Sequence, residues 1–416
     1  MLAPLNTLCR VPKTSRRSIT LEPRVNLEQV LQARLQQRRD QSLYRQRITT
    51  AGPQQTLLRS QGQDYLCFTS NDYLGLANHP QLITAMQSAA QTYGVGSGAS
   101  HLVCGHSEVH AELEQALAKH TGRSRAVLFS SGYMANVGVL GALLDKTDGV
   151  FEDRLNHASL LDGGLLSGAR LQRYRHNDVD DLHQRLRKSK ARHKLVATDS
   201  VFSMDGDIAP LSQLAQVCQA ENAWLMLDDA HGLGVLGPQG AGAAVAGGLN
   251  EEQAPIYMGT LGKALGCYGA FVAGSETLVE AMVQFARSYI YTTAIPPAVA
   301  AASLAALNLL HTEAWRQAHL QQLISLFRGY AQAMDLPLMD SPTAIQPLMI
   351  GDANRALQVS QALQDMGILV TAIRPPTVPA NSARLRITLT AGHSQTQVEQ
   401  LLEALGKLQQ QGLLSP

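Results

Sequence analysis

The chain has 416 residues, of which 45% are hydrophobic, so its length allows two or three domains with a large packed core. Its 34 basic and 33 acidic side chains give a net charge of +1, which argues against a nucleic-acid partner. No run approaches the roughly 18 apolar residues of a membrane span, and the five cysteines lack metal or redox spacing, so we expect no membrane, no metal and a reducing, cytoplasmic location.

Residues 1–25 are expected to form a disordered extension. The first 21 residues contain four basic side chains and no acid, a composition that resembles a transit peptide and equally fits an upstream start codon. From Asn26 on, apolar side chains recur at helical spacing. The pattern predicts an amphipathic arm over 26–68 that ends in a short strand at 65–68.

Two helices are expected next, one that follows His79-Pro80 and ends before Gly94, and one that Ser107 caps. The glycine-rich run between them, residues 94–100, superficially suggests a dinucleotide-binding fingerprint. Its third glycine comes too early and no strand precedes it, so we interpret the run as a loop.

From residue 126 the chain alternates strands and helices, which is typical of a mostly parallel sheet wrapped by helices. This α/β pattern predicts a large domain over 69–296. The predicted strands lie at 126–129, 149–152, 195–199, 224–228, 255–258 and 269–273. Polar residues follow the first five, and ligands in such sheets bind beyond the carboxyl ends of the strands. We therefore expect a binding site along that edge.

After Pro296-Pro297 the composition changes to long helices rich in Ala, Leu and Gln, which predicts a smaller α+β domain over 297–416. Its predicted helices lie at 297–334, at 354–366 and from residue 394 on. Its predicted strands lie at 345–350, 368–372 and 384–389.

One lysine stands out. Lys263 lies among small residues in the run GTLGKALG at 259–266, with no carboxylate beside it. The spacing differs from that of a P-loop, and a Ser-x-x-Lys acylation pair would need serine at Thr260. An amine attacks an aldehyde only when unprotonated, and a desolvated pocket lowers a lysine's pKa towards that state. The run predicts an aldehyde cofactor, with a lysine that merely ends a strand as the alternative.

Upstream residues complete a site for pyridoxal phosphate. Asp228 ends an apolar strand, where its carboxylate would pair with a pyridinium nitrogen, and His231 would donate to a ring oxygen. The phosphate would bind at the start of the helix near Gly132, where free N–H groups and the helix dipole favour an anion. Thr260 would add a hydroxyl. Each residue alone is more often structural, and only the set predicts the cofactor.

Five motifs resemble the α-oxoamine synthase family of fold-type I pyridoxal phosphate enzymes. They are FSSGYMAN at 129–136, DRLNHASLLDG at 153–163, TDSVFSMDGDIAPL at 198–211, LMLDDAHGLGVLG at 225–237 and GTLGKALGCYGAF at 259–271. Segments 287–300, 343–352 and 372–393 are most similar to the members that act in biotin biosynthesis. The resemblance begins near residue 26, and the combination of motifs is highly specific.

The resemblance implies three catalytic residues. Lys263 would bind the cofactor as an internal aldimine and later transfer a proton, Asp228 would pair with the pyridine nitrogen, and His157 would stack on the ring. His231 would contact the ring hydroxyl oxygen. The remaining residues that would line the cofactor are Gly132, Tyr133, Ser203 and Thr260.

The resemblance also implies substrate contacts and a partner. Arg45, Thr377 and His157 would contact the substrate, and Arg386 would hold the amino acid carboxylate through two hydrogen bonds. The family forms homodimers with sites at the interface, so Thr292 would reach the phosphate of the neighbouring subunit.

The implied reaction joins L-alanine to a pimeloyl thioester, carried by CoA or a carrier protein, with loss of CO2 and the thiol. Three alternatives remain open. Another α-oxoamine synthase, such as glycine C-acetyltransferase or 5-aminolevulinate synthase, would share the cofactor residues. An aminotransferase of the same fold would act without a thioester, and a cofactor-binding interaction protein would not exchange with alanine.

Overall fold

The computed structural model describes residues 26–414, so the predicted extension over 1–25 lies outside the described residues. The chain divides into two compact units, one up to Arg47 and one from Ile48 on. In the first unit, α1 (Leu27–Asp40) is capped by Asn26, whose side chain accepts a hydrogen bond from Glu28 N at 3.0 Å. None of the residues of α1 is buried.

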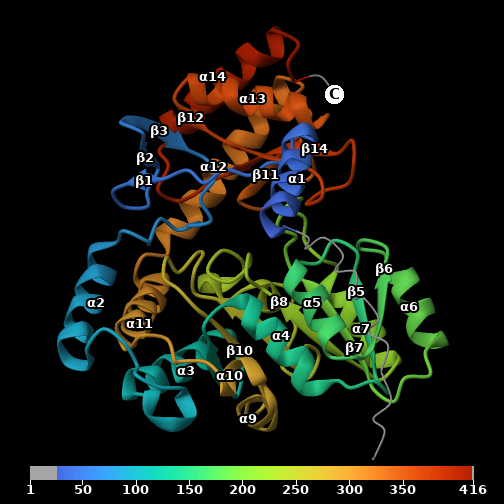
Figure 1. Ribbon diagram of the computed structural model, residues 1–416. Coiled ribbons are helices and arrows are strands. Elements are labelled where there is room, and N and C mark those ends of the chain that lie inside the picture. The colour runs from blue at the N-terminus through green and yellow to red at the C-terminus, as the bar shows by residue number, and fades with distance from the viewer. Residues whose placement is uncertain (1–25, 415–416) are drawn as a thin grey trace, which may run out of the picture. The chain divides into compact units, whose positions relative to one another are not determined.

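The second unit contains a seven-stranded sheet, which confirms the predicted α/β class (Figure 1). Its strands run in the order β4-β10-β9-β8-β7-β5-β6, and only β10 is antiparallel to its neighbours. The strands are β4 (Arg125–Phe129), β5 (Gly149–Asp153), β6 (Arg170–Tyr174), β7 (Lys194–Asp199), β8 (Ala223–Asp228), β9 (Ile256–Thr260) and β10 (Ala270–Gly274).

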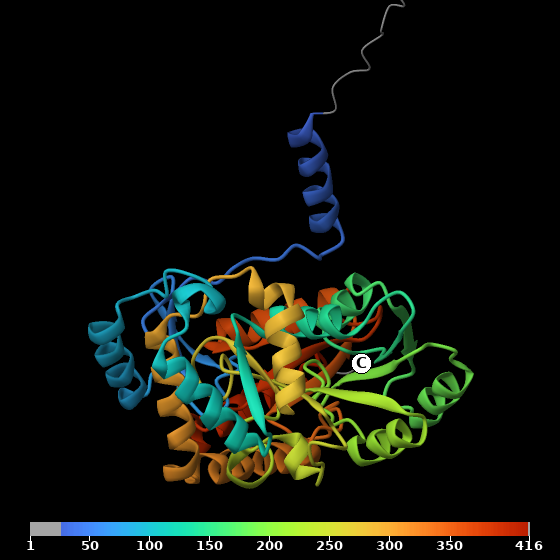
Figure 2. The same cartoon turned by 90° about the horizontal axis from the view of Figure 1, so that it is seen from below.

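Helices surround this sheet (Figure 2). They are α2 (Pro80–Tyr93), α3 (Glu108–Thr121), α4 (Gly132–Leu143), α5 (Ala158–Leu166), α6 (Val179–Lys188), α7 (Leu211–Ala220), α8 (Ala243–Ala246), α9 (Glu276–Phe285) and α10 (Arg287–Ile290). Two short turns add the π-helix η1 (His101–Gly105) and the 3-10 helix η2 (Pro238–Gly240). No helix within residues 26–414 has the length and hydropathy to cross a membrane.

Two smaller sheets lie beyond the main one. The long helices α11 (Pro297–Thr312) and α12 (Trp315–Ala333) lead to a sheet of order β11-β14-β13, with α13 (Ala353–Asp365) and α14 (Gln395–Gln410). The sheet consists of β11 (Ile345–Gly351), β13 (Thr371–Ile373) and β14 (Ala383–Thr388). The third sheet has the order β1-β2-β3-β12. Its strands are β1 (Thr50–Ala51), β2 (Leu57–Ser60), β3 (Gln63–Cys67) and β12 (Ile368–Leu369).

The predicted single strand at 368–372 is wrong in one respect, because it is two strands that belong to different sheets. Ile368 pairs in parallel with β3, while Thr371 pairs antiparallel with β14. The buried Val370 lies between them. Residues 368–373 therefore connect the sheet that contains β1, β2 and β3 to the C-terminal sheet that contains β14.

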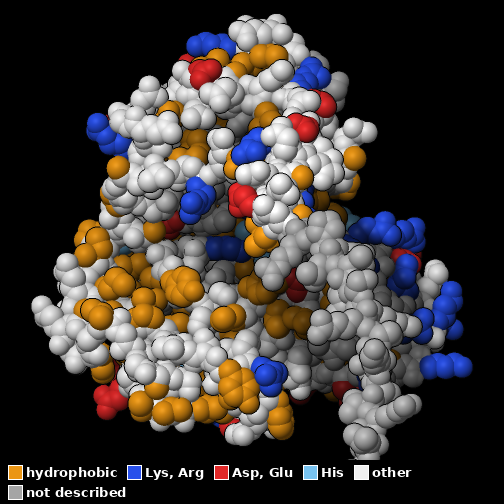
Figure 3. All heavy atoms as spheres, viewed as in Figure 1, with side chains coloured by type: hydrophobic (Ala, Val, Ile, Leu, Met, Phe, Trp, Pro, Cys, Tyr) orange, Lys and Arg blue, Asp and Glu red, His pale blue; other side chains and the backbone are white. Residues whose placement is uncertain are grey.

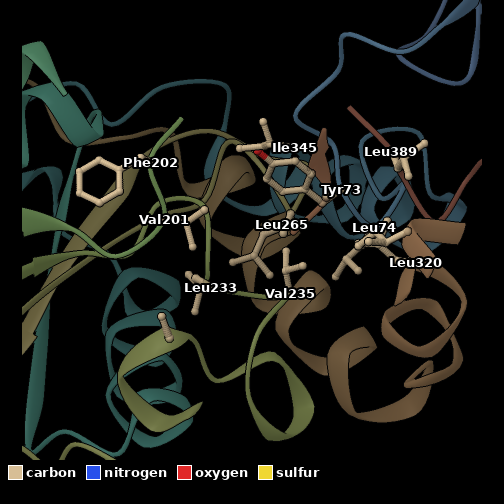
Figure 4. Close-up of a cluster of buried hydrophobic side chains, with 14 of the residues drawn as sticks. Tyr73, Leu74, Val201, Phe202, Leu233, Val235, Leu265, Leu320, Ile345 and Leu389 are labelled. Carbon is tan, nitrogen blue, oxygen red and sulfur yellow. The ribbon is translucent and has the colours of Figure 1, made fainter. Parts of the chain in front are cut away.

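One hydrophobic core joins these parts, and it holds the edge of the large sheet against the C-terminal strands. In Figure 4, Tyr73 lies beside Ile345 and Leu265, with Val201 and Leu233 on the same side of the cluster. All five are almost fully buried. Loops that are far apart in the sequence are thus fixed around the carboxyl ends of β7, β8 and β9.

Candidate active site

Lys263 lies in the turn between β9 and β10, where its amine is 2.8 Å from His231 Nε2. Burial lowers the pKa of Lys263 to about 8, although the carboxylates of Asp228 and Asp199 oppose this shift. The amine therefore loses its proton far more readily than a surface lysine does.

Asp228 ends β8, and its carboxylate is held by two neutral donors. Oδ2 accepts from Asn136 Nδ2 at 2.7 Å and Oδ1 accepts from Ala230 N at 3.0 Å. Asp228 is only 4% exposed. Because neither donor carries a charge, the carboxylate's charge stays available to a cation bound at this edge.

His231 is buried between Lys263 and Tyr73, whose hydroxyl lies 2.6 Å from His231 Nδ1. Burial lowers the pKa of His231 well below its ordinary value, and the Lys263 amine adds to this effect. The imidazole is therefore neutral and carries a single N–H, whose position depends on what its two neighbours donate.

His157 caps α5 at the end of the loop after β5. Its backbone N–H donates to Asp199 Oδ2 at 2.7 Å, and its Nδ1 lies 2.7 Å from Ser159 Oγ. The residue is exposed, yet partial burial of its imidazole lowers the pKa of His157, and the nearby Asp228 carboxylate opposes this shift. Asp199 and Asp228 are paired neighbours at the ends of β7 and β8.

Arg386 on β14 brings the C-terminal sheet to this edge. Its Nε donates to the Ser203 carbonyl at 2.6 Å, Nη1 to Thr388 Oγ1 at 3.0 Å and Nη2 to Asn71 Oδ1 at 3.1 Å. The charge of Arg386 lowers the pKa of both Lys263 and His231. The guanidinium is thus fixed in place near the lysine.

The other predicted cofactor residues lie at strand ends around Lys263. Gly132 begins α4 after β4, and the hydroxyl of the exposed Tyr133 donates to Asp162. Thr260 ends β9, where its hydroxyl donates to Gly269 O at 3.0 Å and accepts from Gly262 N at 3.3 Å. Thr260 therefore shapes the turn that presents Lys263.

Three predicted residues are not placed in this cluster. Arg45 belongs to the first unit, which ends at Arg47. Thr377 is exposed in the loop between β13 and β14, and Thr292 is half-buried after α10. Their roles stay predictions.

Five residues of the cluster were assigned no role from sequence. They are Asn71, Tyr73, Asn136, Ser159 and Asp199. Asn136, Ser159 and Asp199 fall inside motifs that carry the family resemblance, and Asn71 and Tyr73 lie in a polar loop after β3. For Asn136, Ser159 and Asp199, position inside a motif is the available signal, and most of the contacts in the cluster join residues that are distant in the sequence.

Two side-chain clusters have metal-like composition within residues 26–414. In the first, His101, His106 and His110 lie together, but both nitrogens of His110 are engaged. Its Nε2 lies 2.8 Å from the Ile295 carbonyl, and its Nδ1 accepts from Ser107 N at 3.0 Å. This arrangement is a hydrogen-bonded helix cap.

The second cluster, His176, Asp205 and Asp207, already contains cations, because Asp205 pairs with Arg384 and His176 lies between two carboxylates. His176 Nδ1 lies 2.9 Å from Asp153 Oδ1, and Nε2 lies 2.8 Å from Asp207 Oδ2. Although desolvation alone would lower it, these two carboxylates raise the pKa of His176 to about 9. The imidazolium therefore takes the place that a metal would need.

The residues around Lys263 fit pyridoxal phosphate. They offer a readily deprotonated amine for the aldehyde, the fixed Asp228 carboxylate for the pyridinium nitrogen and the neutral His231 for a ring oxygen. The start of α4, a helix of 12 residues, is a suitable site for the phosphate.

The chain matches known proteins along most of its length. The model of the aminotransferase class I and II family matches residues 63–405. An 8-amino-7-oxononanoate synthase of Cellvibrio japonicus (strain Ueda107) is 61% identical over 92% of this chain and 96% of that protein. Another, from Nitrosococcus oceani, is 60% identical over 89% of this chain and 98% of that protein.

Two solved structures are similar along most of their length. A serine palmitoyltransferase from S. paucimobilis with a bound PLP-myriocin aldimine has a TM-score of 0.87 at 32% identity, covering 92% of this chain and 97% of that one. An 8-amino-7-oxononanoate synthase from Francisella tularensis has a TM-score of 0.74 at 34% identity, covering 84% of this chain and 98% of that one.

Proposed function

The chain belongs to the aminotransferase class I and II family, among its α-oxoamine synthases, and we propose that it condenses L-alanine with a pimeloyl thioester. The products are 8-amino-7-oxononanoate, CO2 and the free thiol, in biotin biosynthesis. About 60% identity to 8-amino-7-oxononanoate synthases supports this substrate pair. The observation that carries the chemistry is the Lys263 amine, 2.8 Å from His231 at the sheet edge where Asp228 ends its strand.

Pyridoxal phosphate is the cofactor, and when bound it supplies an aldehyde for the amino group and a ring that stabilises negative charge at the α-carbon. Lys263 provides the amine that holds the cofactor and the base that takes the α-proton of alanine. Because burial lowers the pKa of Lys263 to about 8, part of the amine is unprotonated near neutral pH and returns its proton readily.

Three further side chains act on the cofactor ring. Asp228 would pair with the ring nitrogen and hold it protonated, which would make the ring a better acceptor of negative charge. His231 would offer a hydrogen bond to the ring oxygen, and the exposed His157 would cover the ring face. The residues that line the remaining surface are Gly132, Tyr133, Ser203 and Thr260.

Arg386 binds the carboxylate of alanine. Its side chain is held by three hydrogen bonds before substrate arrives, which reduces the entropy lost on binding. By the family resemblance, Thr377 would contact the substrate and Arg45 would serve its acyl end, where a distal carboxylate would suit an arginine.

We infer a homodimer in the cytoplasm. Figure 3 shows hydrophobic side chains gathered over the part of this face that α2, α3 and α9 occupy in Figure 1. The large exposed apolar residues on α2, η1, α9 and the turn after α10 are Ile83, Met86, Tyr93, Leu102, Val103, Phe285 and Tyr291. Patches of this kind mark protein interfaces, and Thr292 would reach the partner's phosphate there.

The free thiols of the described cysteines suit a reducing compartment, in agreement with the proposed cytoplasmic location.

A thiol-release assay tests the reaction. We expect the highest kcat/KM for L-alanine with pimeloyl-CoA among the four pairings of alanine or glycine with pimeloyl-CoA or acetyl-CoA. Each buried methylene of the acyl chain contributes about 0.8 kcal/mol. A preference for glycine with acetyl-CoA would overturn the assignment, and turnover that needs a keto acid and no thioester would indicate an aminotransferase.

A further inference from the structure

Asn136 is a buried amide on α4, a helix whose other residues are apolar, small or aromatic. Its Nδ2 lies 2.7 Å from Asp228 Oδ2 and 2.8 Å from Ser159 Oγ. An ionised carboxylate only accepts hydrogen bonds, so the NH2 group of Asn136 must face Asp228. Both amide hydrogens are thereby used.

Ser159 continues the contact to His157. Its Oγ lies 2.7 Å from His157 Nδ1. Since this oxygen already accepts from Asn136, the serine's own proton is free to be donated to His157 Nδ1. The backbone N–H of Ser159 also donates to Nδ1, at 3.3 Å. Both contacts fix Nδ1 as an acceptor and place the single proton of the neutral imidazole on Nε2.

We infer that Asn136 is a positioning residue that ties the Asp228 carboxylate to the His157 ring through Ser159. This inference rests on the proposed function, in which these two side chains act on one cofactor ring from different directions. Asn136 itself touches neither the cofactor nor the substrate in this role. It keeps a carboxylate on β8 and an imidazole on the loop after β5 in one fixed relation.

The residue type suits the role. A cationic side chain at this position would neutralise Asp228, and an aspartate would place a second negative charge beside it. An apolar residue would leave Oδ2 of Asp228 and Oγ of Ser159 without their shared donor. A neutral amide alone supplies two donors and leaves the charge of Asp228 unchanged.

The test uses Asn136→Ala, Ser159→Ala and the double variant, with Thr121→Val as a matched control. Thr121 is a buried polar residue on α3 whose hydroxyl donates to Leu117 O at 2.9 Å, away from this site. Three quantities are measured: the tautomer of His157 from ring 15N shifts in the cofactor-free protein, the Kd for pyridoxal phosphate, and kcat separately from the KM for the thioester.

We expect each single variant to shift the His157 tautomer equilibrium. Asn136→Ala should raise the Kd for the cofactor and lower kcat, each by about tenfold to a hundredfold, with little change in the KM for the thioester. The double variant should have nearly the same tautomer equilibrium as either single variant, because both substitutions interrupt the same hydrogen-bonded connection between Asp228 and His157.

Unchanged 15N shifts and cofactor affinity in a folded Asn136→Ala protein would overturn the inference, as would equal losses in Thr121→Val. If Asn136→Ala does not fold, Ser159→Ala decides, since it cuts the same bridge with a smaller cavity. The 15N shifts and the Kd need no substrate. A wrong substrate pair would therefore contradict the proposed function and leave this inference standing.

Discussion

Tyr73 and His231 form a buried hydrogen bond of 2.6 Å between the phenol oxygen and Nδ1, on the opposite ring nitrogen from the one that faces Lys263. Because Tyr73 is almost fully buried, this contact is shielded from water. When Lys263 donates to Nε2, the His231 proton sits on Nδ1 and is donated to Tyr73. When Nε2 donates to a ligand instead, the Tyr73 hydroxyl can donate to Nδ1.

Tyr73→Phe should therefore reduce turnover while keeping the fold. The hydroxyl is lost without a large cavity, and His231 no longer has a partner that accommodates both tautomers. We expect kcat/KM to fall about tenfold, the effect of roughly 1.4 kcal/mol in the transition state. Tyr65→Phe is the control, since Tyr65 is also buried and donates to Gln63. Equal effects of the two changes would contradict a role for Tyr73 in the site.

Lys263→Ala should give a folded protein that has lost the visible absorbance of a lysine-bound cofactor. The turn between β9 and β10 needs no amine for its backbone hydrogen bonds, so the melting temperature should change little. Lys146→Ala, on an exposed loop, is the control. Borohydride reduction that attaches the cofactor to another lysine would refute the assignment of Lys263.

The rate at which cofactor-free protein captures pyridoxal phosphate should rise with pH and level off above about pH 8. Burial lowers the pKa of Lys263 from 10.5 to about 8, and only the unprotonated amine attacks the aldehyde. A lowered folded pKa means that the unfolded chain holds more protons between these values, so this group's destabilising effect is full below pH 8 and disappears towards pH 10.5. A capture rate that still rises tenfold per unit at pH 9.5 would contradict the shift.

His176→Gln should make stability less dependent on pH. The pKa of His176 is raised to about 9, so its stabilising contribution is complete below the unfolded value of 6.5 and is lost as pH rises through 9. Because part of this site is open to solvent, screening weakens both ion pairs, and we expect the variant to lose about 1 to 2 kcal/mol of unfolding free energy at pH 6 and clearly less at pH 9.5.

Urea unfolding at the two pH values measures this difference. His193→Gln, at an exposed position, is the control. An equal loss at pH 6 and pH 9.5 would show that His176 acts through packing and not through its charge.

The sheet was predictable because its central strands are short apolar runs that end in polar residues, as at Asp228. The edge strand β6 was missed because its sequence, RLQRY, is mostly polar. The strand at 368–372 read as one because Val370 is apolar, and only three-dimensional pairing shows that its ends belong to different sheets.

The site was predictable only in part. Lys263, Asp228 and His231 lie close enough in the sequence to form a recognisable set. Tyr73 is 158 residues from His231, and Asn136 is 92 residues from Asp228, so no local spacing in the sequence predicts these contacts. A single asparagine inside an apolar helix produces no periodic pattern in the sequence. Its role depends on which carboxylate the fold places beside it.

Asp228→Asn should nearly abolish turnover while leaving the protein folded. Asp228 uses one oxygen for Asn136 and the other for Ala230 N, and an amide has one acceptor oxygen, so one donor would face an NH2 group. More importantly, a neutral partner no longer holds a pyridinium proton. We expect kcat to fall by about a hundredfold or more, equivalent to roughly 3 kcal/mol of transition-state stabilisation.

Asp229→Asn is the informative comparison, because the two carboxylates are neighbours with different surroundings. Asp229 is buried and accepts from Ser200, from Tyr257 OH at 2.7 Å and from Ala243 N at 2.8 Å. Every one of these partners belongs to the scaffold, so Asp229→Asn should lower the melting temperature and leave the cofactor spectrum close to normal. Near-normal kcat in Asp228→Asn together with a severe loss in Asp229→Asn would reverse the assignment, and would mean that the carboxylate facing the cofactor is the second of the pair.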